Sequence, residues 1–267
     1  MPVTFSAHGD AMLMPEGTAL LAIGMFAAVF VAALFARVRR SPYNLTQYVV
    51  FSLNSVMTRL LWRARISGPL PVATGQGAII VCNHRCPIDP AMVALAADRP
   101  VHWMVAKEYA EHPALAWFWR RLQVIPVSRG GIDTAATKQA IRLAQEGGLV
   151  GMFPEGRIND NDRLLLPGRP GAAMIALRAR VPVIPCYLSG TPYNGTVWAS
   201  FFLPARARLE VGSPIDLSAY YGRERQREVQ EELTRCFLLE IAKLAGQPDF
   251  EPELAGRFYK PGQENRG

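Results

Sequence analysis

An N-terminal run of hydrophobic residues has the pattern of a membrane-spanning helix. Residues 18–36 carry no charged side chain, and this is about the length that a helix needs to cross a bilayer core. Two acidic residues precede the run, and three arginines follow it at once (Arg37, Arg39 and Arg40). The bias favours a membrane anchor with its arginine end in the cytoplasm. A signal peptide would carry its positive charges before a shorter apolar core. A buried helix of a soluble fold is the remaining alternative.

The next stretch, residues 41–66, predicts a second helix with one apolar face. Its hydrophobic residues recur at helical spacing, as Val49, Leu53, Val56 and Leu60. Three arginines lie near its end, where cations suit the helix dipole and could meet lipid phosphates (Arg59, Arg63 and Arg65). The pattern fits an amphipathic helix in the membrane interface. It fits equally a helix packed on the core of the main domain.

From Gly68 onward, short apolar runs alternate with helical patterns. The predicted strands are 78–82, 102–106, 123–127, 149–153 and 183–188, with a late strand in 205–213. The predicted helices are 89–97, 113–121, 134–146 and 171–179, with a closing helix at 224–244. Alternation of this kind predicts an α/β fold with a largely parallel central sheet flanked by helices. We therefore expect an anchor and amphipathic helix over 1–66, a main domain over 67–246 and a tail over 247–267.

Composition and charge limit the classes of binding partner but do not identify one of them. Half of the 267 residues are hydrophobic and the formal net charge is +7, which favours anionic partners. Nucleic acid, anionic lipid and a phosphorylated small substrate all satisfy that charge. The four cysteines form no CxxC pair, so we expect reduced thiols rather than disulfides.

Polar residues follow several of the predicted strands. Asn83 and His84 follow the first, Lys107 the second, Ser128-Arg129 the third and Glu155-Gly156-Arg157 the fourth. Ligands of open α/β sheets bind beyond the carboxyl ends of the strands. We therefore expect these side chains to border one cleft.

The stretch Val81–Ala91, VCNHRCPIDPA, contains a histidine and an aspartate five residues apart. A histidine can take a proton from a hydroxyl, and a carboxylate across a short turn can fix its tautomer. The spacing alone also fits a histidine that merely caps a turn. A nucleophilic cysteine is disfavoured, because Cys82 and Cys86 lie two residues from His84, where side chains rarely face each other. The histidines show no metal-ligand spacing, so no metal site is expected.

Four blocks in order carry a family resemblance. They read NHRCPID from Asn83, VAKE from Val105 with IPVSR from Ile125, FPEGR from Phe153 and VPVIP from Val181. Together they resemble the glycerolipid acyltransferase family typified by 1-acylglycerol-3-phosphate acyltransferase. One departure matters: the family usually has a threonine between the glycine and the arginine of the third block, whereas Arg157 here follows Gly156 directly.

The resemblance implies a mechanism and a set of site residues. His84, oriented by Asp89, would deprotonate the hydroxyl of a lysophospholipid, and that oxygen would attack the thioester of acyl-CoA or acyl-carrier protein. Lys107 and Arg129 would bind the acceptor's phosphate, and Glu155 and Gly156 would shape the acceptor site. Because of the departure, either Arg157 reaches the phosphate from a shifted position or another cation, Arg169, supplies that contact.

The resemblance also implies the partners and the location. No cofactor beyond the acyl donor and no nucleic acid is expected; the partners would be membrane lipids, the lysophospholipid and the donor. The protein would be membrane-associated, with its catalytic domain on the cytoplasmic face. Two alternatives remain at this point: an acceptor that is another lysophospholipid or a lyso-aminolipid, or a catalytically silent lipid-binding protein.

Overall fold

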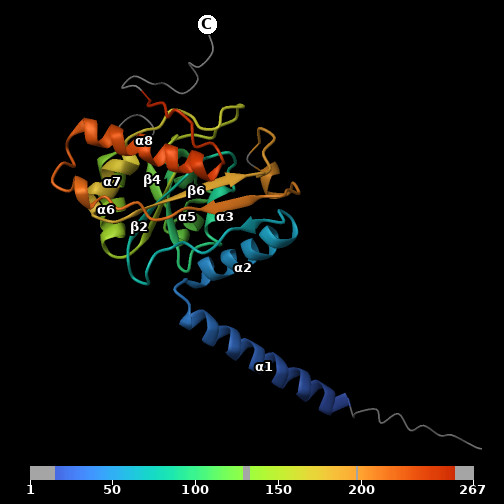
Figure 1. Ribbon diagram of the computed structural model, residues 1–267. Helices are drawn as coiled ribbons and strands as arrows, with labels where there is room; N and C mark the ends of the chain where they lie inside the picture. Colours follow the sequence, from blue (N-terminus) through green and yellow to red (C-terminus); the bar gives the residue numbers. More distant parts are fainter. Residues whose placement is uncertain (1–15, 129–132, 197, 256–267) are drawn as a thin grey trace, which may run out of the picture. The chain divides into compact units, whose positions relative to one another are not determined.

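The computed structural model describes residues 16–128, 133–196 and 198–255 (Figure 1). It divides into two compact units, residues 1–42 and 43–267. In the first unit, α1 (Glu16–Arg40) is one continuous helix. Its 24-residue segment Gly17–Arg40 is the one helix of the described chain that is long and apolar enough to cross a bilayer. At 1.5 Å per residue this segment is about 36 Å long, which exceeds the roughly 30 Å of a hydrocarbon core.

The second unit is built on a seven-stranded sheet with the order β1-β7-β6-β2-β5-β3-β4. Its strands are β1 (Arg65–Ile66), β2 (Ala78–Cys82), β3 (Val101–Ala106), β4 (Ile125–Val127), β5 (Leu149–Met152), β6 (Val183–Ser189) and β7 (Arg208–Val211). Strands β2 to β6 are parallel to one another. Strand β7 is antiparallel to β6, and β1 runs parallel to β7. The predicted α/β fold with a largely parallel sheet is confirmed.

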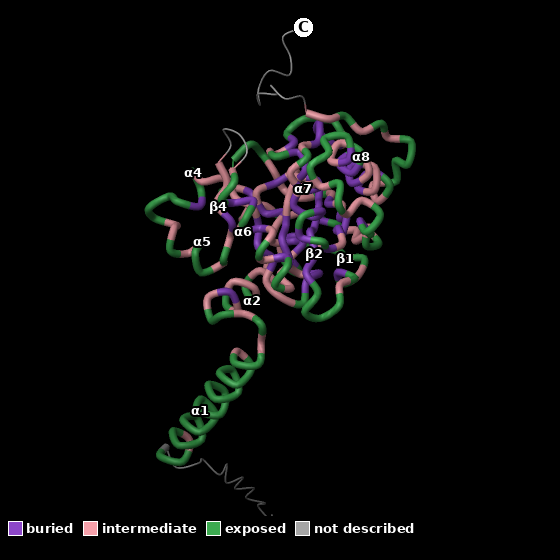
Figure 2. Tube along the Cα trace, turned by 90° about the vertical axis from the view of Figure 1, so that its left-hand side faces the viewer, coloured by how far each residue is buried: buried purple, intermediate pink, exposed green. Residues whose placement is uncertain are grey.

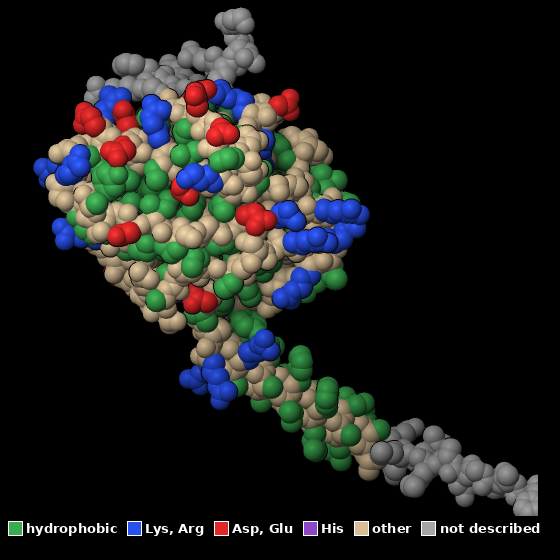
Figure 3. Space-filling view, in the orientation of Figure 1, with side chains coloured by type: hydrophobic (Ala, Val, Ile, Leu, Met, Phe, Trp, Pro, Cys, Tyr) green, Lys and Arg blue, Asp and Glu red, His purple; other side chains and the backbone are tan. Residues whose placement is uncertain are grey.

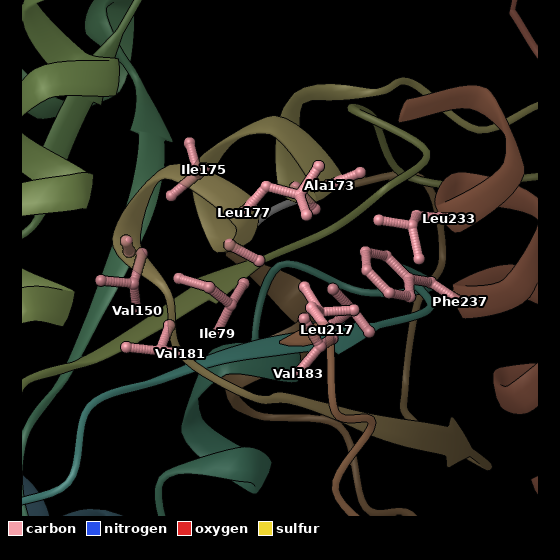
Figure 4. Packing of buried hydrophobic residues seen from close by; sticks show 14 of the residues in the cluster. Ile79, Val150, Ala173, Ile175, Leu177, Val181, Val183, Leu217, Leu233 and Phe237 are labelled. Atoms are coloured by element: carbon pink, nitrogen blue, oxygen red, sulfur yellow. The ribbon is translucent and has the colours of Figure 1, made fainter. Parts of the chain in front are cut away.

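Helices cover both faces of this sheet, and the alternation of strand side chains separates two hydrophobic cores. Ile79 and Val81 of β2 belong to one core, where α6 (Thr134–Gln145), α7 (Gly171–Ala179) and α8 (Arg227–Leu244) pack. Figure 2 shows the buried residues along the trace, and Figure 4 shows Ile79 beside Leu177, Val183 and Phe237. Ala78, Ile80 and Cys82 point to the other face, toward α3 (Asp89–Val93) and the buried Trp62. Strand β2 is the central strand of the sheet, and all five of its residues are buried.

Helix α2 (Leu45–Leu60) packs in an unexpected orientation. Its N-terminus carries a capping box, in which Asn44 and Gln47 each bind the other's backbone N–H. The residues that it buries are polar, Gln47 and Thr58, and Asn54 donates a hydrogen bond to the Ala91 carbonyl at 2.7 Å. The predicted apolar stripe is exposed instead, with Val49, Leu53, Val56 and Leu60 each more than half accessible. These four residues do not pack on the core, whereas Met57 and Leu61, which widen the same apolar stripe, pack against it.

Several element boundaries differ from the sequence prediction. The helix predicted over 41–66 ends at Leu60, and Arg65–Ile66 form β1 instead, paired with β7. Two short helices follow β3: α4 (Lys107–Ala110), which was not predicted, and α5 (Ala116–Leu122). The second compact unit begins at Tyr43, so it includes α2 together with the sheet. Two-residue strands and four-residue helices carry too little periodicity to be recognised in a sequence.

Candidate active site

The His84 turn begins where β2 ends, and it is tied to the neighbouring strand. The Asn83 side chain donates to the Leu188 carbonyl at 2.8 Å and accepts from the Leu188 N–H at 2.7 Å. This reciprocal pair takes the place of a β-ladder contact between the end of β2 and β6. Asn83 is buried, so both bonds are shielded from water. The His84 side chain emerges beyond them and is 16% exposed.

Asp89 orients the His84 ring. Its Oδ2 lies 3.0 Å from His84 Nδ1 and also accepts the backbone N–H groups of Arg85, at 2.6 Å, and Cys86, at 2.8 Å. Because an ionised carboxylate only accepts, we assign the ring hydrogen to Nδ1, which leaves Nε2 unprotonated and able to take a proton. Asp89 is fully buried. The predicted pair therefore has the geometry of a base and its orienting group rather than of a simple turn.

An aromatic stack fixes the plane of the same ring. His84 and Phe153 are stacked with their centroids 3.8 Å apart and their planes 6° apart. Trp103 stacks on the far side of Phe153 at 4.9 Å. Trp103 in turn packs against Gly151, where any β-carbon would lie 2.6 Å from the indole. The imidazole is thus held by a carboxylate at its edge and by a ring on its face.

Glu155 joins the backbone of the His84 turn to the backbone at Leu166. One carboxylate oxygen accepts the His84 backbone N–H at 2.7 Å, and the other accepts the Leu166 N–H at 2.8 Å. The side chain is 1% exposed, and burial raises the pKa of Glu155 to about 7. Glu155 therefore shapes the site through the main chain that carries His84.

Arg85 ties the same turn to the loop after β5. Its guanidinium donates to the carbonyl oxygens of Asn159, Asn161 and Arg163 at 2.5–3.2 Å. The backbone N–H of Asn159 donates to the His84 carbonyl at 2.7 Å. Neither residue was singled out in the sequence, because such contacts join segments more than 70 residues apart.

The four cations predicted to bind phosphate differ in their surroundings. Lys107 follows β3 and forms an ion pair with Asp133 at 3.3 Å, with 41% of its side chain exposed. Hydrogen bonds from the Ala136 and Ser128 amides hold the pKa of Asp133 well below its usual range. Arg169 lies against Gly156, whose β-carbon position is 3.0 Å from the Arg169 side chain, and its N–H donates to the Pro154 carbonyl. Arg157 is half-buried in the same turn. Arg129 lies outside the described residues.

The cysteines near His84 do not have the environment of nucleophiles. All four cysteines of the chain are free thiols, as predicted. Cys82 and Cys86 are buried, and burial raises the pKa of the Cys86 thiol to about 11. The Cys86 thiol donates to the Pro192 carbonyl at 2.7 Å. A group with so high a pKa holds almost no thiolate at neutral pH.

The site residues that the sequence did not single out act as positioning groups. They are Trp103, Asp133 and Asn159, together with two that lie inside the recognised blocks without an assigned role, Arg85 and Phe153. Asp133 alone carried a local signal, because an aspartate directly before a helical pattern is a common N-cap. The structure joins His84, Asp89 and Glu155 directly and brings Gly156 and Arg169 together beside them.

Comparison with known proteins places this arrangement in a family. Residues 63–189, which contain all four blocks and the whole His84 turn, match the family model described as Acyltransferase. This segment is an Acyltransferase domain. The enzyme is thus an acyltransferase, and the reading as a catalytically silent lipid-binding protein is set aside. The matched segment begins at Arg63 and ends with β6, so it covers the five parallel strands.

Three relatives of this acyltransferase show the extent of the likeness. The 1-acyl-sn-glycerol-3-phosphate acyltransferase of Bacillus subtilis is 26% identical over 164 residues, covering 60% of this chain and 79% of that protein. The protein of the same name from Limnanthes alba is 32% identical, and the match covers 44% of this chain and 43% of that protein. The crystal structure of the Thermotoga maritima 1-acyl-sn-glycerophosphate acyltransferase shares the fold, with a TM-score of 0.56 at 21% identity over 70% of this chain and 76% of that one.

Proposed function

We propose that this acyltransferase moves a fatty acyl group from acyl-CoA or acyl-carrier protein to the free hydroxyl of 1-acylglycerol-3-phosphate, giving phosphatidic acid. The observation that carries the proposal is the buried Asp89 carboxylate at 3.0 Å from His84 Nδ1. That contact leaves His84 Nε2 as the base for an alcohol. The acceptor is suggested by the names of the Bacillus subtilis and Limnanthes alba relatives.

The reaction needs no nucleophile from the protein. His84 Nε2 takes the proton of the acceptor hydroxyl as its oxygen attacks the thioester carbonyl carbon. The tetrahedral intermediate collapses with cleavage of the carbon–sulfur bond, and the thiolate takes the proton back from the imidazolium. General-base assistance accounts for roughly 10²–10⁴-fold, and holding the two substrates in register for up to about 7–11 kcal/mol of the barrier.

We also propose that the enzyme works at a membrane, with its catalytic unit on the cytoplasmic side. The apolar helix α1 and its three terminal arginines support this orientation. The outward apolar face of α2 supports it independently, because an exposed hydrophobic stripe on a folded domain needs a nonaqueous partner. A lysophospholipid acceptor would be drawn from that same surface.

The test is acyl transfer by the purified full chain in detergent. Release of free thiol from acyl-CoA is measured with 1-acylglycerol-3-phosphate, with other lysophospholipids and with a lyso-aminolipid. We expect turnover with a lysophospholipid and its loss in His84→Ala, while the exposed His112→Ala serves as a matched control. Wild-type turnover by His84→Ala would refute the mechanism.

A second acceptor class is favoured by one observation, the missing threonine between Gly156 and Arg157. If the missing threonine changes how the enzyme holds the acceptor's phosphate, the enzyme will prefer another lysophospholipid or a lyso-aminolipid in the same panel. Arg129→Ala addresses the phosphate itself. It should raise the KM for a phosphorylated acceptor more than the KM for acyl-CoA, and an unchanged acceptor KM would remove Arg129 from the phosphate site.

A further inference from the structure

Four arginines gather at the open edge of the sheet, apart from the His84 turn. Arg63, Arg65, Arg206 and Arg208, here called the arginine cluster, line a cavity of about 590 Å³. Two chain segments bring them together: Arg65 N–H donates to the Ala207 carbonyl at 2.9 Å, and Ala207 N–H donates to the Trp62 carbonyl at 3.0 Å. Figure 3 shows Lys and Arg side chains gathered beside hydrophobic ones on the right-hand side of the domain.

The cluster carries more positive charge than its surroundings balance. All four side chains are exposed, and within the described residues the one ion pair they make joins Arg208 to Glu210 at 3.5 Å. Arg63 also holds a backbone φ of 40°, a left-handed conformation that a residue with a side chain rarely adopts. Guanidinium groups bind phosphate oxygens in a forked geometry, so the chemistry that fits the cavity is a phosphate ester.

Apolar side chains border the same cluster. Leu60, the last residue of α2, is 74% exposed, and Phe202 in the loop before β7 is 76% exposed. The Ala205 N–H donates to the Leu61 carbonyl at 3.2 Å, which joins that loop to the end of α2. Trp198 in the same loop is 66% exposed. Basic groups beside exposed aromatic and aliphatic side chains are the surface that meets a bilayer of anionic lipid.

We propose that the arginine cluster binds the phosphate headgroup of an anionic phospholipid in the bilayer surface. The inference rests on the membrane location proposed above. A soluble phosphate compound, such as the free donor, would satisfy the arginines but would leave Leu60 and Phe202 in water. A phospholipid covers both, because its headgroup and its acyl chains are joined.

This headgroup site is separate from the acceptor's place at His84. The amino ends of β1 and β7 lie at the same end of the strands as the carboxyl end of β2. This is because β7 is antiparallel to β6, whereas β6 is parallel to β2. In the strand order, β7 is two strands from β2 and β1 is three strands away. At about 4.8 Å per strand, the arginines stand roughly 10–15 Å from the strand that carries His84. The phosphate of a glycerol lipid reacting at His84 is only a few bonds from its hydroxyl, whereas the cluster stands on strands that are not hydrogen-bonded to β2.

The experiment measures binding and turnover on the same preparation of full chain in a nonionic detergent. Calorimetric titrations use dihexanoyl-phosphatidylglycerol, dihexanoyl-phosphatidylcholine, inorganic phosphate and free CoA. The test variant is Arg65→Gln/Arg206→Gln. The control, Arg178→Gln/Arg225→Gln, removes the same charge from another arginine-lined cavity. Thermal melting confirms that both variants are folded, as expected for exposed positions.

We expect phosphatidylglycerol to bind more tightly than phosphatidylcholine or phosphate, and the test variant to lose about fivefold for each arginine removed. The control variant should keep wild-type affinity. Equal affinity of the wild type for the two lipids, or an equal loss in the control variant, would overturn the proposal. Loss of CoA binding alone would assign the cluster to the donor and likewise overturn it. Thiol release reports on the proposed function separately, so failure of one is not failure of the other.

Discussion

Replacing Asp89 by asparagine tests the catalytic pair with the least disturbance of the fold. Oδ2 accepts three N–H groups, from the His84 ring and from the backbones of Arg85 and Cys86. Two backbone donors on one oxygen hold the amide oxygen of asparagine in that position, so all three hydrogen bonds persist. What is lost is the negative charge beside the ring when it becomes an imidazolium.

The magnitude follows from the contact distance. A full charge at 3.0 Å interacts with the imidazolium by about 5.5 kcal/mol at an effective dielectric constant of 20, which corresponds to about 10⁴-fold. Water at the partly exposed ring lowers this figure, so we expect Asp89→Asn to reduce kcat by roughly 10²–10⁴-fold. The new NH₂ group replaces Oδ1, a buried atom with no hydrogen-bond partner among the described residues. An unpaired donor there should destabilise the fold by about 1–3 kcal/mol.

The assay is steady-state thiol release at saturating acyl-CoA, with thermal melting as the control for folding. Since Asp89 acts through His84, the double variant His84→Ala/Asp89→Asn should be no slower than His84→Ala alone. A further loss in the double variant, or a kcat for Asp89→Asn within threefold of wild type, would refute the role of Asp89 as the orienting carboxylate.

Three further predictions concern the surroundings of His84. The raised pKa of Glu155, about 7 against an ordinary value of 4.5, means that the folded chain binds its proton more tightly than the unfolded chain does. Relative to Glu155→Gln, the wild type should therefore lose about 3 kcal/mol of unfolding free energy as the pH rises from 4.5 to 7, measured by denaturant titration; parallel curves would contradict this. Phe153→Leu removes the ring stacked on His84 and should lower kcat about 2- to 13-fold with little change in KM, whereas an unchanged kcat would show that the stack is dispensable. Gly151→Ala would place a methyl group against the Trp103 ring and should lower the free energy of unfolding by about 1–3 kcal/mol, measured by thermal melting. An unchanged melting temperature would show that the indole moves aside.

The periodicity of hydrophobic residues predicted most of the helices and strands, but it did not predict which face of α2 is buried. The strand 78–82 and the helix 171–179 have the predicted boundaries, since their residues are apolar and flanked by clear breakers. The apolar stripe of 41–66 was visible too, but a stripe does not reveal what covers it. Burial of Gln47, the bond from Asn54 to Ala91 and the packing of Met57 on the core turn Val49, Leu53, Val56 and Leu60 outward. Those contacts depend on tertiary structure and leave no trace in a hydrophobic pattern.

The contacts of the candidate site were likewise predictable only where they are local in the sequence. The block around His84 and Asp89 is local in sequence, so their pairing across one turn could be anticipated from the five-residue spacing. Glu155 was recognised as a block residue, but its two bonds to backbone N–H groups join segments 71 and 11 residues away. Trp103 reaches the site through Phe153 and has no sequence signal at all. Long-range contacts of this kind become visible only when the strands are placed side by side.

The bond between Asn83 and Leu188 sets an order of events during synthesis. The catalytic turn is made early by the ribosome, yet its anchor lies 105 residues later in the chain. Until that later strand has been translated and paired, the turn has no fixed position relative to Phe153 and Glu155. A growing chain therefore carries its histidine through the synthesis of more than 100 further residues without an assembled base, and acyl-transfer competence arises only when the last parallel strand has been made.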